Sequence, residues 1–414
     1  MIKRISNTFA SRLLIVVANF LLVVVTSRTL GSEGRGEISL FMTDFTLVLL
    51  FTGIVGGSAM AYFVPKKDVF TLTVIGYCWS LPIAGLGVVL LHLFHPSAYT
   101  LWLFGALLVQ SFTVVHQMVL LGKNHLFRYN LSTSIQPVFN LAYVYARFHF
   151  GNEKSVYIFV EGFFLSSLLA YLAAVLQTWS FFIAHTLQNA KETALDMLRY
   201  GSGTYVSTII QTVAYRLSYY VLFWFGMSQT IGELSNGLAL TEATWLISHS
   251  LSLVLYAHLL NTPDEGTQHK LTVQLALLCF LLTFFSLAFL VLLPSWVFVA
   301  LFGKDFGNLT LYILILSPGV LLFGASTVFA HYFSAKGNYA LNNIKSILGL
   351  ITGLVCLFVF IPLFGNKGAA VANSISYAAS GIYLFFVYFK KTATPLSAVL
   401  DWKGLWDILR NRES

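Results

Sequence analysis

Charged residues are scarce in this chain. Asp, Glu, Lys and Arg together make up 10% of its 414 residues, whereas hydrophobic residues make up 57%. Soluble globular domains carry about 25% charged residues, so this composition excludes an ordinary soluble protein. It predicts an all-α integral membrane protein, because each crossing of the hydrocarbon core needs roughly 20 predominantly apolar residues in a helix.

Cysteine is also rare, and familiar catalytic motifs are missing. The three thiols, Cys78, Cys279 and Cys356, fall within apolar runs, which does not indicate a disulfide framework. The sequence has no HExxH, GxSxG or GxxxxGK[ST] motif. We therefore expect neither a cofactor nor a metal site, and the lone histidines His249 and His258 are more typical of ordinary polar contacts.

Long apolar runs lie on both sides of one polar stretch, residues 184–200. We expect a six-helix bundle over residues 1–183 and another over residues 201–391, about 12 spanning helices in all. The predicted spans are 8–30, 37–64, 69–94, 99–121, 131–150, 155–183, 201–226, 230–260, 271–302, 308–333, 344–364 and 368–389. Residues 184–200 are predicted to be a cytoplasmic amphipathic linker, and residues 392–414 either an interfacial or a solvated cytoplasmic tail.

Basic residues are distributed unevenly between the two predicted sides. Most of the 24 Lys and Arg residues fall in segments on the same side as the N-terminus. The positive-inside rule then predicts that both termini are cytoplasmic. The net charge of +8 follows from this topology and does not indicate binding of nucleic acid.

The two halves share a weak internal repeat. Asn124 and Asn152 in the first half correspond to Asn338 and Asn366 in the second, and the residues around them are similar. An even number of spans in each half gives both halves the same orientation, so we expect a parallel pseudo-twofold relation about the membrane normal. The alternative is that short loops rich in Gly and Asn are alike by chance.

Polar side chains recur at helical spacing inside several predicted spans, where they are too polar to face lipid. An ionisable group there costs roughly 2.5–3.5 kcal/mol on insertion scales. We therefore expect these helix faces to line a hydrated cavity. The candidate cavity residues are Arg216, Arg12, Asn19, Gln211, Tyr215, Tyr219, Gln136 and Asn140.

Arginine is the candidate anchor for an anionic group in this cavity. A guanidinium can donate to two oxygens of one phosphate, and Arg216 is predicted near mid-depth with Arg12 closer to the inner mouth. The alternative is that Arg216 pairs with Glu242 on the adjacent helix and only stabilises the bundle.

Three intramembrane carboxylates, Glu242, Asp44 and Glu161, are candidates for binding a coupling proton or sodium ion. Glu242 is the preferred one because it is predicted to lie deepest. For the other two the alternative is a structural ion pair, of Asp44 with Arg35 or of Glu161 with Arg147.

Several segments resemble bacterial polysaccharide flippases of the multidrug/oligosaccharidyl-lipid/polysaccharide (MOP) exporter superfamily, including the O-antigen flippases. They are TSRTLGSEGRGEISL, GKNHLFRYN and, most specifically, the region from residue 301 to residue 377 that contains IPLFGNKGAAVANSISY. The resemblance covers residues 1–391. It implies two six-helix bundles in a V shape around a central cavity, with alternating access.

The resemblance also implies a function and partners. The protein would move an undecaprenyl-diphosphate-linked oligosaccharide from the inner to the outer leaflet of the bacterial inner membrane, for surface polysaccharides such as the O-antigen of lipopolysaccharide. Its partners would be this substrate, membrane lipids and other polysaccharide-assembly proteins. The interior cations are few for such a flippase, which leaves the charge of the substrate open.

Three alternatives remain open. A drug or cation antiporter would have a negative cavity, and the drug exporters of the superfamily often carry an acidic residue in the first span, where this chain has none. A glycan polymerase or ligase would carry a long outer loop, whereas the predicted outer connections are short. A scaffold without transport would leave the polar helix faces unexplained.

Overall fold

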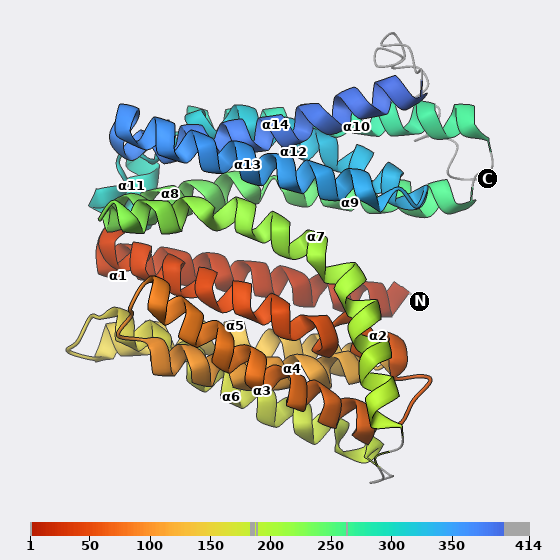
Figure 1. The fold of residues 1–414 in the computed structure, drawn as a ribbon. Helices are drawn as coiled ribbons and strands as arrows, with labels where there is room; N and C mark the ends of the chain where they lie inside the picture. Colours follow the sequence, from red (N-terminus) through yellow and green to blue (C-terminus); the bar gives the residue numbers. More distant parts are fainter. Residues whose placement is uncertain (1, 183–186, 188, 262–263, 393–414) are drawn as a thin grey trace. The chain divides into compact units, whose positions relative to one another are not determined.

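The structure, a computed structural model, describes residues 2–182, 187, 189–261 and 264–392, and helices account for all of the regular structure in these residues (Figure 1). The all-α prediction is thus confirmed for the described part of the chain. The chain divides into two compact units, one up to Ile209 and the other from Ile210 onward. We call them the N-terminal and the C-terminal unit and describe each by itself. The predicted tail beyond Thr392 lies outside the described residues.

Seven helical stretches of the described residues are long and apolar enough to cross a membrane, so the chain is a multi-pass membrane protein. These stretches are Asn7–Phe63, Val69–Phe94, Thr100–Gly122, Val156–Phe181, Glu265–Leu292, Leu309–Ala335 and Tyr339–Thr392. The first and the last each contain two predicted spans. The helices over residues 126–150, 190–224, 228–242 and 245–261 lie outside these stretches, and the last two are short, at 15 and 17 residues. These four helices carry most of the predicted polar faces. The number of 12 spans in two six-helix bundles stays a prediction.

The N-terminal unit begins with a long bent helix. Helix α1 (Ile2–Gly56) has a break at Gly31, where φ is 70° and ψ is −171°, and the predicted span 8–30 lies in the arm before this break. Glycine adopts this positive φ without the steric cost that a side chain would add. The predicted span 37–64 was wrong as a single helix, because the second arm of α1 ends at Gly56 and a separate short helix follows the non-helical Gly57. The other helices of the unit are α2 (Ser58–Phe63), α3 (Val69–Phe94), α4 (Thr100–Gly122), α5 (Leu126–Phe150) and α6 (Val156–Thr178).

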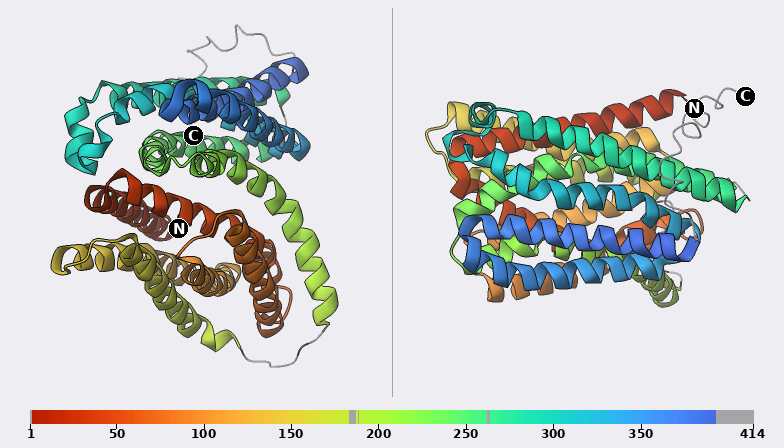
Figure 2. Two further views of the ribbon diagram at one scale, coloured as in Figure 1. Left: turned by 60° about the vertical axis from the view of Figure 1, so that its left-hand side comes forward. Right: turned by 90° about the horizontal axis from the view of Figure 1, so that it is seen from above.

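Local sequence explains how these helices begin and pack. The carboxylate of Asp68 caps α3 by accepting a hydrogen bond of 2.8 Å from the Thr71 amide. Helix α4 packs against α3, α5 and α6 (Figure 2). In the core, the rings of Phe41 and Phe45 meet the ring of Phe163 edge-on, at centroid distances of 6.0 and 4.7 Å. This geometry is favoured for aromatic pairs and adds to the energy of burial.

The predicted linker 184–200 has no boundary at residue 200, because the helix that contains its second part continues beyond that residue. Residues 183–186 and 188 lie outside the described residues, and the remainder belongs mainly to α7 (Ala190–Trp224), which runs unbroken past residue 200. Met197 on α7 is fully buried against Ile54 and Met60 of the N-terminal unit. The ring of Tyr200 stacks on that of Tyr62 at 4.4 Å. The first part of α7 is therefore packed into the N-terminal unit, and its cytoplasmic location stays a prediction.

The C-terminal unit is built around α12. This helix packs against α8, α9, α10, α13 and α14 (Figures 1 and 2). The helices that follow α7 are α8 (Ser228–Glu242), α9 (Trp245–Asn261), α10 (Glu265–Leu292), α11 (Ser295–Phe302), α12 (Leu309–Ala335), α13 (Tyr339–Phe364) and α14 (Gly368–Thr392).

Two predicted spans of this unit are interrupted. The span 230–260 is divided at Ala243 and Thr244, where the amides of Leu246 and Ile247 bond to carbonyls three residues back instead of four. The span 271–302 was also wrong as a single helix, because α10 ends at Leu292 and α11 starts at Ser295. The intervening Leu293 is extended, the conformation favoured before a proline.

Two helices that the predicted internal repeat pairs, α4 and α12, end in similar turns, and the repeat itself stays a prediction. After α4 the amide of His125 bonds to the carbonyl of Leu120, and after α12 the amide of Asn338 bonds to that of Phe333. The residue before each of these amides has a positive φ, 61° at Asn124 and 74° at Gly337. Both helices thus end in the same type of capping turn. The register differs by one residue from the sequence comparison, which aligned Asn124 with Asn338.

Candidate functional site

The candidate site is a partly buried polar cluster of the C-terminal unit, centred on Glu242. The Nη2 and Nη1 atoms of Arg216 lie 3.0 and 3.4 Å from the two carboxylate oxygens, and the hydroxyl of Tyr377 donates to Oε1 at 2.7 Å. Three donors therefore satisfy one carboxylate. The structure forms the Arg216–Glu242 pair that the sequence analysis named as the alternative to a free anchor.

The irregular backbone after α8 places this carboxylate. Glu242 is the last residue of α8, directly before the turn at Ala243 and Thr244. Trp245 starts α9, and its Nε1 donates to the Val320 carbonyl of α12 at 2.9 Å. This hydrogen bond satisfies the polar edge of a buried indole and ties the start of α9 to α12.

Four aromatic rings pack together beside the ion pair. They come from α7, α9, α12 and α14, and all their mutual centroid distances lie between 4.7 and 5.8 Å. We call this group the aromatic cluster; its members are Tyr215, Trp245, Phe323 and Tyr377. Because it keeps water away from one side of the carboxylate, it strengthens the electrostatic attraction between Arg216 and Glu242.

The four predicted cavity residues of α7 come together as their spacing indicated. The amide of Gln211 donates to the hydroxyl of Tyr215 one turn later. The guanidinium of Arg216 lies over the ring of Tyr219, 5.6 Å from its centroid, and Tyr219 itself is buried. Arg216 is thus held by one carboxylate and one ring.

A buried lysine was missed by the sequence analysis, which placed it near the inner boundary of the span 344–364. Lys345 of α13 is only 5% exposed, and its Nζ lies 3.8 Å from the ring centroid of Phe323. Within the described residues, no carboxylate lies within 4.0 Å of this amine. The sequence held one signal, because Lys345 shares a helix face with the buried Gly349 and Gly353.

Two histidines lie near Lys345. Lys345 and His249 of α9 are close enough to interact electrostatically, and the imidazoles of His249 and His331 are 6.5 Å apart. His331 is half-buried and its Nδ1 bonds to the carbonyl of Thr327 at 2.9 Å, whereas His249 is exposed. The three side chains of Lys345, His331 and His249 therefore form a group that reaches from the interior to an accessible imidazole.

The two candidate coupling carboxylates of the N-terminal unit, Asp44 and Glu161, each have a basic neighbour. The buried Asp44 accepts a hydrogen bond of 3.0 Å from Nε2 of His95, a contact that the sequence analysis did not foresee. Glu161 lies 3.4 Å from Nη1 of Arg147, and this matches the structural pair given as its alternative. The same nitrogen of Arg147 donates to the Tyr143 hydroxyl at 3.0 Å.

The other predicted cavity residues also lie in the N-terminal unit. Arg12 and Asn19 are exposed on α1, whereas Gln136 of α5 is half-buried. Asn140 is 1% exposed, and its amide oxygen has no hydrogen-bond partner among the described residues. The cavity that these residues would share with Arg216 stays a prediction.

A further polar network of the N-terminal unit had no signal in the sequence. The hydroxyl of Tyr77 lies 2.6 Å from Nε2 of His116 and 3.1 Å from the hydroxyl of Tyr171, and Nδ1 of His116 lies 2.7 Å from Oγ1 of Thr178. The network borders a cavity of about 370 Å³. Its ring nitrogens are satisfied internally, which suits a structural role.

Comparison with known proteins gives little at the level of sequence. No known family profile matches the chain. A stretch of 72 residues is 38% identical to an uncharacterized membrane protein of Haemophilus influenzae, over 17% of this chain and 18% of that protein. The match thus spans less than a fifth of the relative, which is itself a membrane protein.

The fold is far more informative. The lipid II flippase MurJ, in an inward closed conformation, matches with a TM-score of 0.73 at 18% identity, over 97% of this chain and 89% of that chain. An inward-facing multidrug resistance MATE family transporter of the MOP superfamily matches with a TM-score of 0.71 at 17% identity, over 92% and 94%. A mutant of the MATE transporter VcmN of Vibrio cholerae gives 0.63 at 13% identity, over 96% and 98%.

These likenesses define the class of fold: it is the fold of the MOP-superfamily transporters. The structures that it resembles include both a lipid II flippase and MATE transporters, one of them a multidrug resistance transporter. The more specific likeness to O-antigen flippases remains the prediction made from the sequence.

Proposed function

We propose that the protein is a flippase that moves a lipid-diphosphate-linked oligosaccharide from the inner to the outer leaflet of the bacterial inner membrane, by alternating access, for surface polysaccharide biosynthesis. The fold that it shares with a lipid II flippase supports this proposal. The observation that carries it is the buried amine of Lys345, which has no carboxylate partner among the described residues.

Lys345 and Arg216 differ in whether a carboxylate lies beside them. The charge of Arg216 is already neutralised by Glu242 at 3.0 Å. A buried cation without a counter-ion is strongly unfavourable, so a site that keeps one is suited to an anionic ligand. The diphosphate of a lipid-linked sugar would supply that anion, and the exposed imidazole of His249 gives it a route to the amine.

The ion pair suggests how the site is coupled to an ion gradient. Glu242 is our candidate for the coupling residue, and its carboxylate holds Arg216 in the observed structure. A proton bound to Glu242 would weaken this pair and free the guanidinium to bind a phosphate oxygen. A sodium ion would have to displace the same guanidinium, so we favour the proton. We propose no further cofactor and no enzymatic step.

The test is transport in reconstituted vesicles. A labelled diphosphate-linked oligosaccharide is placed in one leaflet, and its arrival in the other is measured with and without a proton or sodium gradient. We expect Lys345→Gln to slow transport about tenfold or more, the loss that follows from one charged hydrogen bond. The matched control is Lys367→Gln, an exposed lysine beyond the other end of α13. No movement by the unaltered protein under any gradient would overturn the proposal.

The second candidate is a MATE-like drug or cation antiporter, favoured by the likeness to MATE structures. Efflux of a cationic dye that is abolished by Glu242→Gln but unaffected by Lys345→Gln would support it instead. A glycan polymerase or ligase is less favoured. The loop between α5 and α6, which we predict to be outside, is only the stretch from Gly151 to Ser155.

A further inference from the structure

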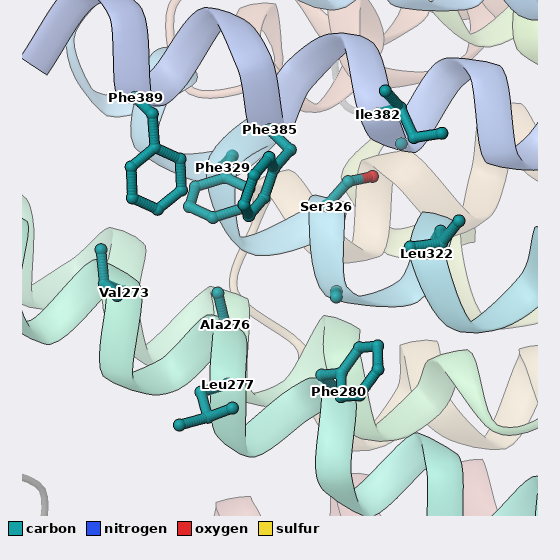
Figure 3. Close-up of a pocket in the computed structure, with 12 residues that line it drawn as sticks. Val273, Ala276, Leu277, Phe280, Leu322, Ser326, Phe329, Ile382, Phe385 and Phe389 are labelled. Carbon is teal, nitrogen blue, oxygen red and sulfur yellow. The ribbon is translucent and has the colours of Figure 1, made fainter. Parts of the chain in front are cut away.

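An apolar groove runs along the C-terminal unit between α10, α12 and α14 (Figure 3). It encloses about 440 Å³, a volume within the usual range for ligand sites. Phe280 of α10, Phe329 of α12 and the pair Phe385 and Phe389 of α14 are among its walls. The hydroxyl of Ser326, which also lines the groove, already donates to the Phe323 carbonyl at 2.7 Å. The groove therefore offers apolar contacts and no unused donor.

Small residues keep the groove open. Ala276 of α10, Ala325 of α12 and Gly381 of α14 contribute to its lining. A side chain at Gly381 would lie 2.7 Å from the Leu322 carbonyl, so the glycine lets α14 approach α12 closely there. The small side chains of these three residues leave the space between α10, α12 and α14 unfilled.

Basic residues gather at one end of the groove. Figure 3 shows Val273 and Phe389 at the same end. Lys270 lies one helical turn before Val273 on α10, and Lys390 and Lys391 directly follow Phe389; all three are exposed. Lys336 follows the last residue of α12 and shares a face with Phe329, two turns earlier.

Two carboxylates lie near the same end, so the described residues there include four lysines and two carboxylates. Glu265 lies 3.5 Å from Nζ of Lys336, but its side chain is 76% exposed. Asp264 caps α10 by accepting the Thr267 amide at 2.8 Å, and these hydrogen bonds from Thr267 lower the pKa of its carboxyl. The described residues here thus keep an excess of positive charge.

We propose that this groove binds one acyl chain of an acidic phospholipid, with the phosphate of the headgroup held by Lys270 and Lys336. The apolar walls suit a hydrocarbon chain, since α10, α12 and α14 all belong to membrane-spanning stretches. The lysines suit a negative headgroup, because a basic side chain near an anionic leaflet contributes about 1 kcal/mol. A sugar or a drug would need polar partners that the groove lacks. The inference does not depend on the proposed transport activity.

Native mass spectrometry of the purified full chain tests the acyl-chain part of the proposal. Phosphatidylglycerol and phosphatidylcholine with identical chains are added separately, and retained lipid is counted. We expect one retained phosphatidylglycerol per protein. We expect Ala325→Phe to fill the groove and abolish retention of phosphatidylglycerol. Ala288→Phe makes the same change on α10 but outside the groove, and should leave the retention unchanged. Equal retention by these two variants, with both eluting as folded protein, would refute the site. Ala325→Leu gives a milder filling variant if Ala325→Phe does not fold.

The headgroup is tested by charge removal. We expect Lys270→Gln and Lys336→Gln each to weaken the preference for phosphatidylglycerol about fivefold, the equivalent of about 1 kcal/mol per lysine. Lys304→Gln, an exposed lysine beyond the other end of α10, should leave it unchanged. Equal binding of both lipids by the unaltered protein would overturn the headgroup assignment. Displacement of phosphatidylglycerol by an equimolar polyprenyl phosphate would assign the groove to an isoprenoid chain instead.

Discussion

Replacement of Glu242 by glutamine should destabilise the C-terminal unit markedly. The substitution keeps the size of the side chain but removes the charge that faces Arg216 at 3.0 Å. The loss of one partner from a buried pair costs about 3–5 kcal/mol. The side chains of Arg216 and Glu242 are 29% and 14% exposed, so water screens part of this energy. We therefore expect a decrease of about 2–3 kcal/mol in the free energy of unfolding.

A buried thiol makes this decrease measurable in detergent. Cys279 is fully buried in the C-terminal unit, whereas Cys78 is exposed and Cys356 is half-buried. In a background with Cys78→Ala and Cys356→Ala, a thiol-reactive dye reports the unfolding of this unit alone. A change of 1 kcal/mol shifts the Tm of a unit of this size by about 2–4 °C, so Glu242→Gln should lower it by about 4–12 °C.

A double-mutant cycle decides whether the pair itself is responsible. If the pair stabilises the unit, Arg216→Gln combined with Glu242→Gln loses less than the two single variants together, by about 1 kcal/mol or more. Tyr377→Phe removes one hydrogen bond from the same carboxylate and should cost about 1–3 kcal/mol. Strict additivity of the Arg216 and Glu242 variants would refute the reasoning.

Three other predictions address different parts of the molecule. Lys345→Met should raise the Tm while it lowers transport, because it removes a buried amine that has no carboxylate partner among the described residues; an unchanged or lower Tm would contradict this. Met197→Ala should cost the N-terminal unit about 2–5 kcal/mol, measured by scanning calorimetry of the purified protein, whereas Leu195→Ala, at a position 46% exposed, should cost little. In a cysteine-free background, an impermeant maleimide should label Lys154→Cys in intact cells but Lys123→Cys only after lysis, and the reverse pattern would invert the predicted topology.

The helices follow from the sequence because their signal is local. Long apolar runs and the requirement for internally bonded backbone predict spanning helices without knowledge of their neighbours. The breaks were harder to place. Pro294 is a local signal for the end of α10, but the predicted span 271–302 included it because the residues on both sides are apolar. The turn at Ala243 and Thr244 carries neither Gly nor Pro, and α8 and α9 both pack against α12 there, so only the tertiary structure reveals it.

The candidate site was predictable only in part, because some of its contacts depend on the tertiary structure and have no local signal. Helical spacing brings Gln211, Tyr215 and Arg216 to one face, and a neighbouring helix supplies Glu242. Tyr377 completes the network from 135 residues further along the chain, a distance over which no periodicity carries information. Lys345 looked like a residue of a helix end, because burial depends on what packs around it and not on its position in an apolar run.

The unbroken course of α7 means that the boundary between the two units falls inside a helix and not in a loop. Met197 and Arg216 belong to the same ladder of backbone hydrogen bonds, although each lies in a different unit. Proline has no amide hydrogen and its ring clashes with the preceding turn, so it costs about 3 kcal/mol or more inside a helix. The residues at this boundary are therefore expected to accept many side chains but not a proline.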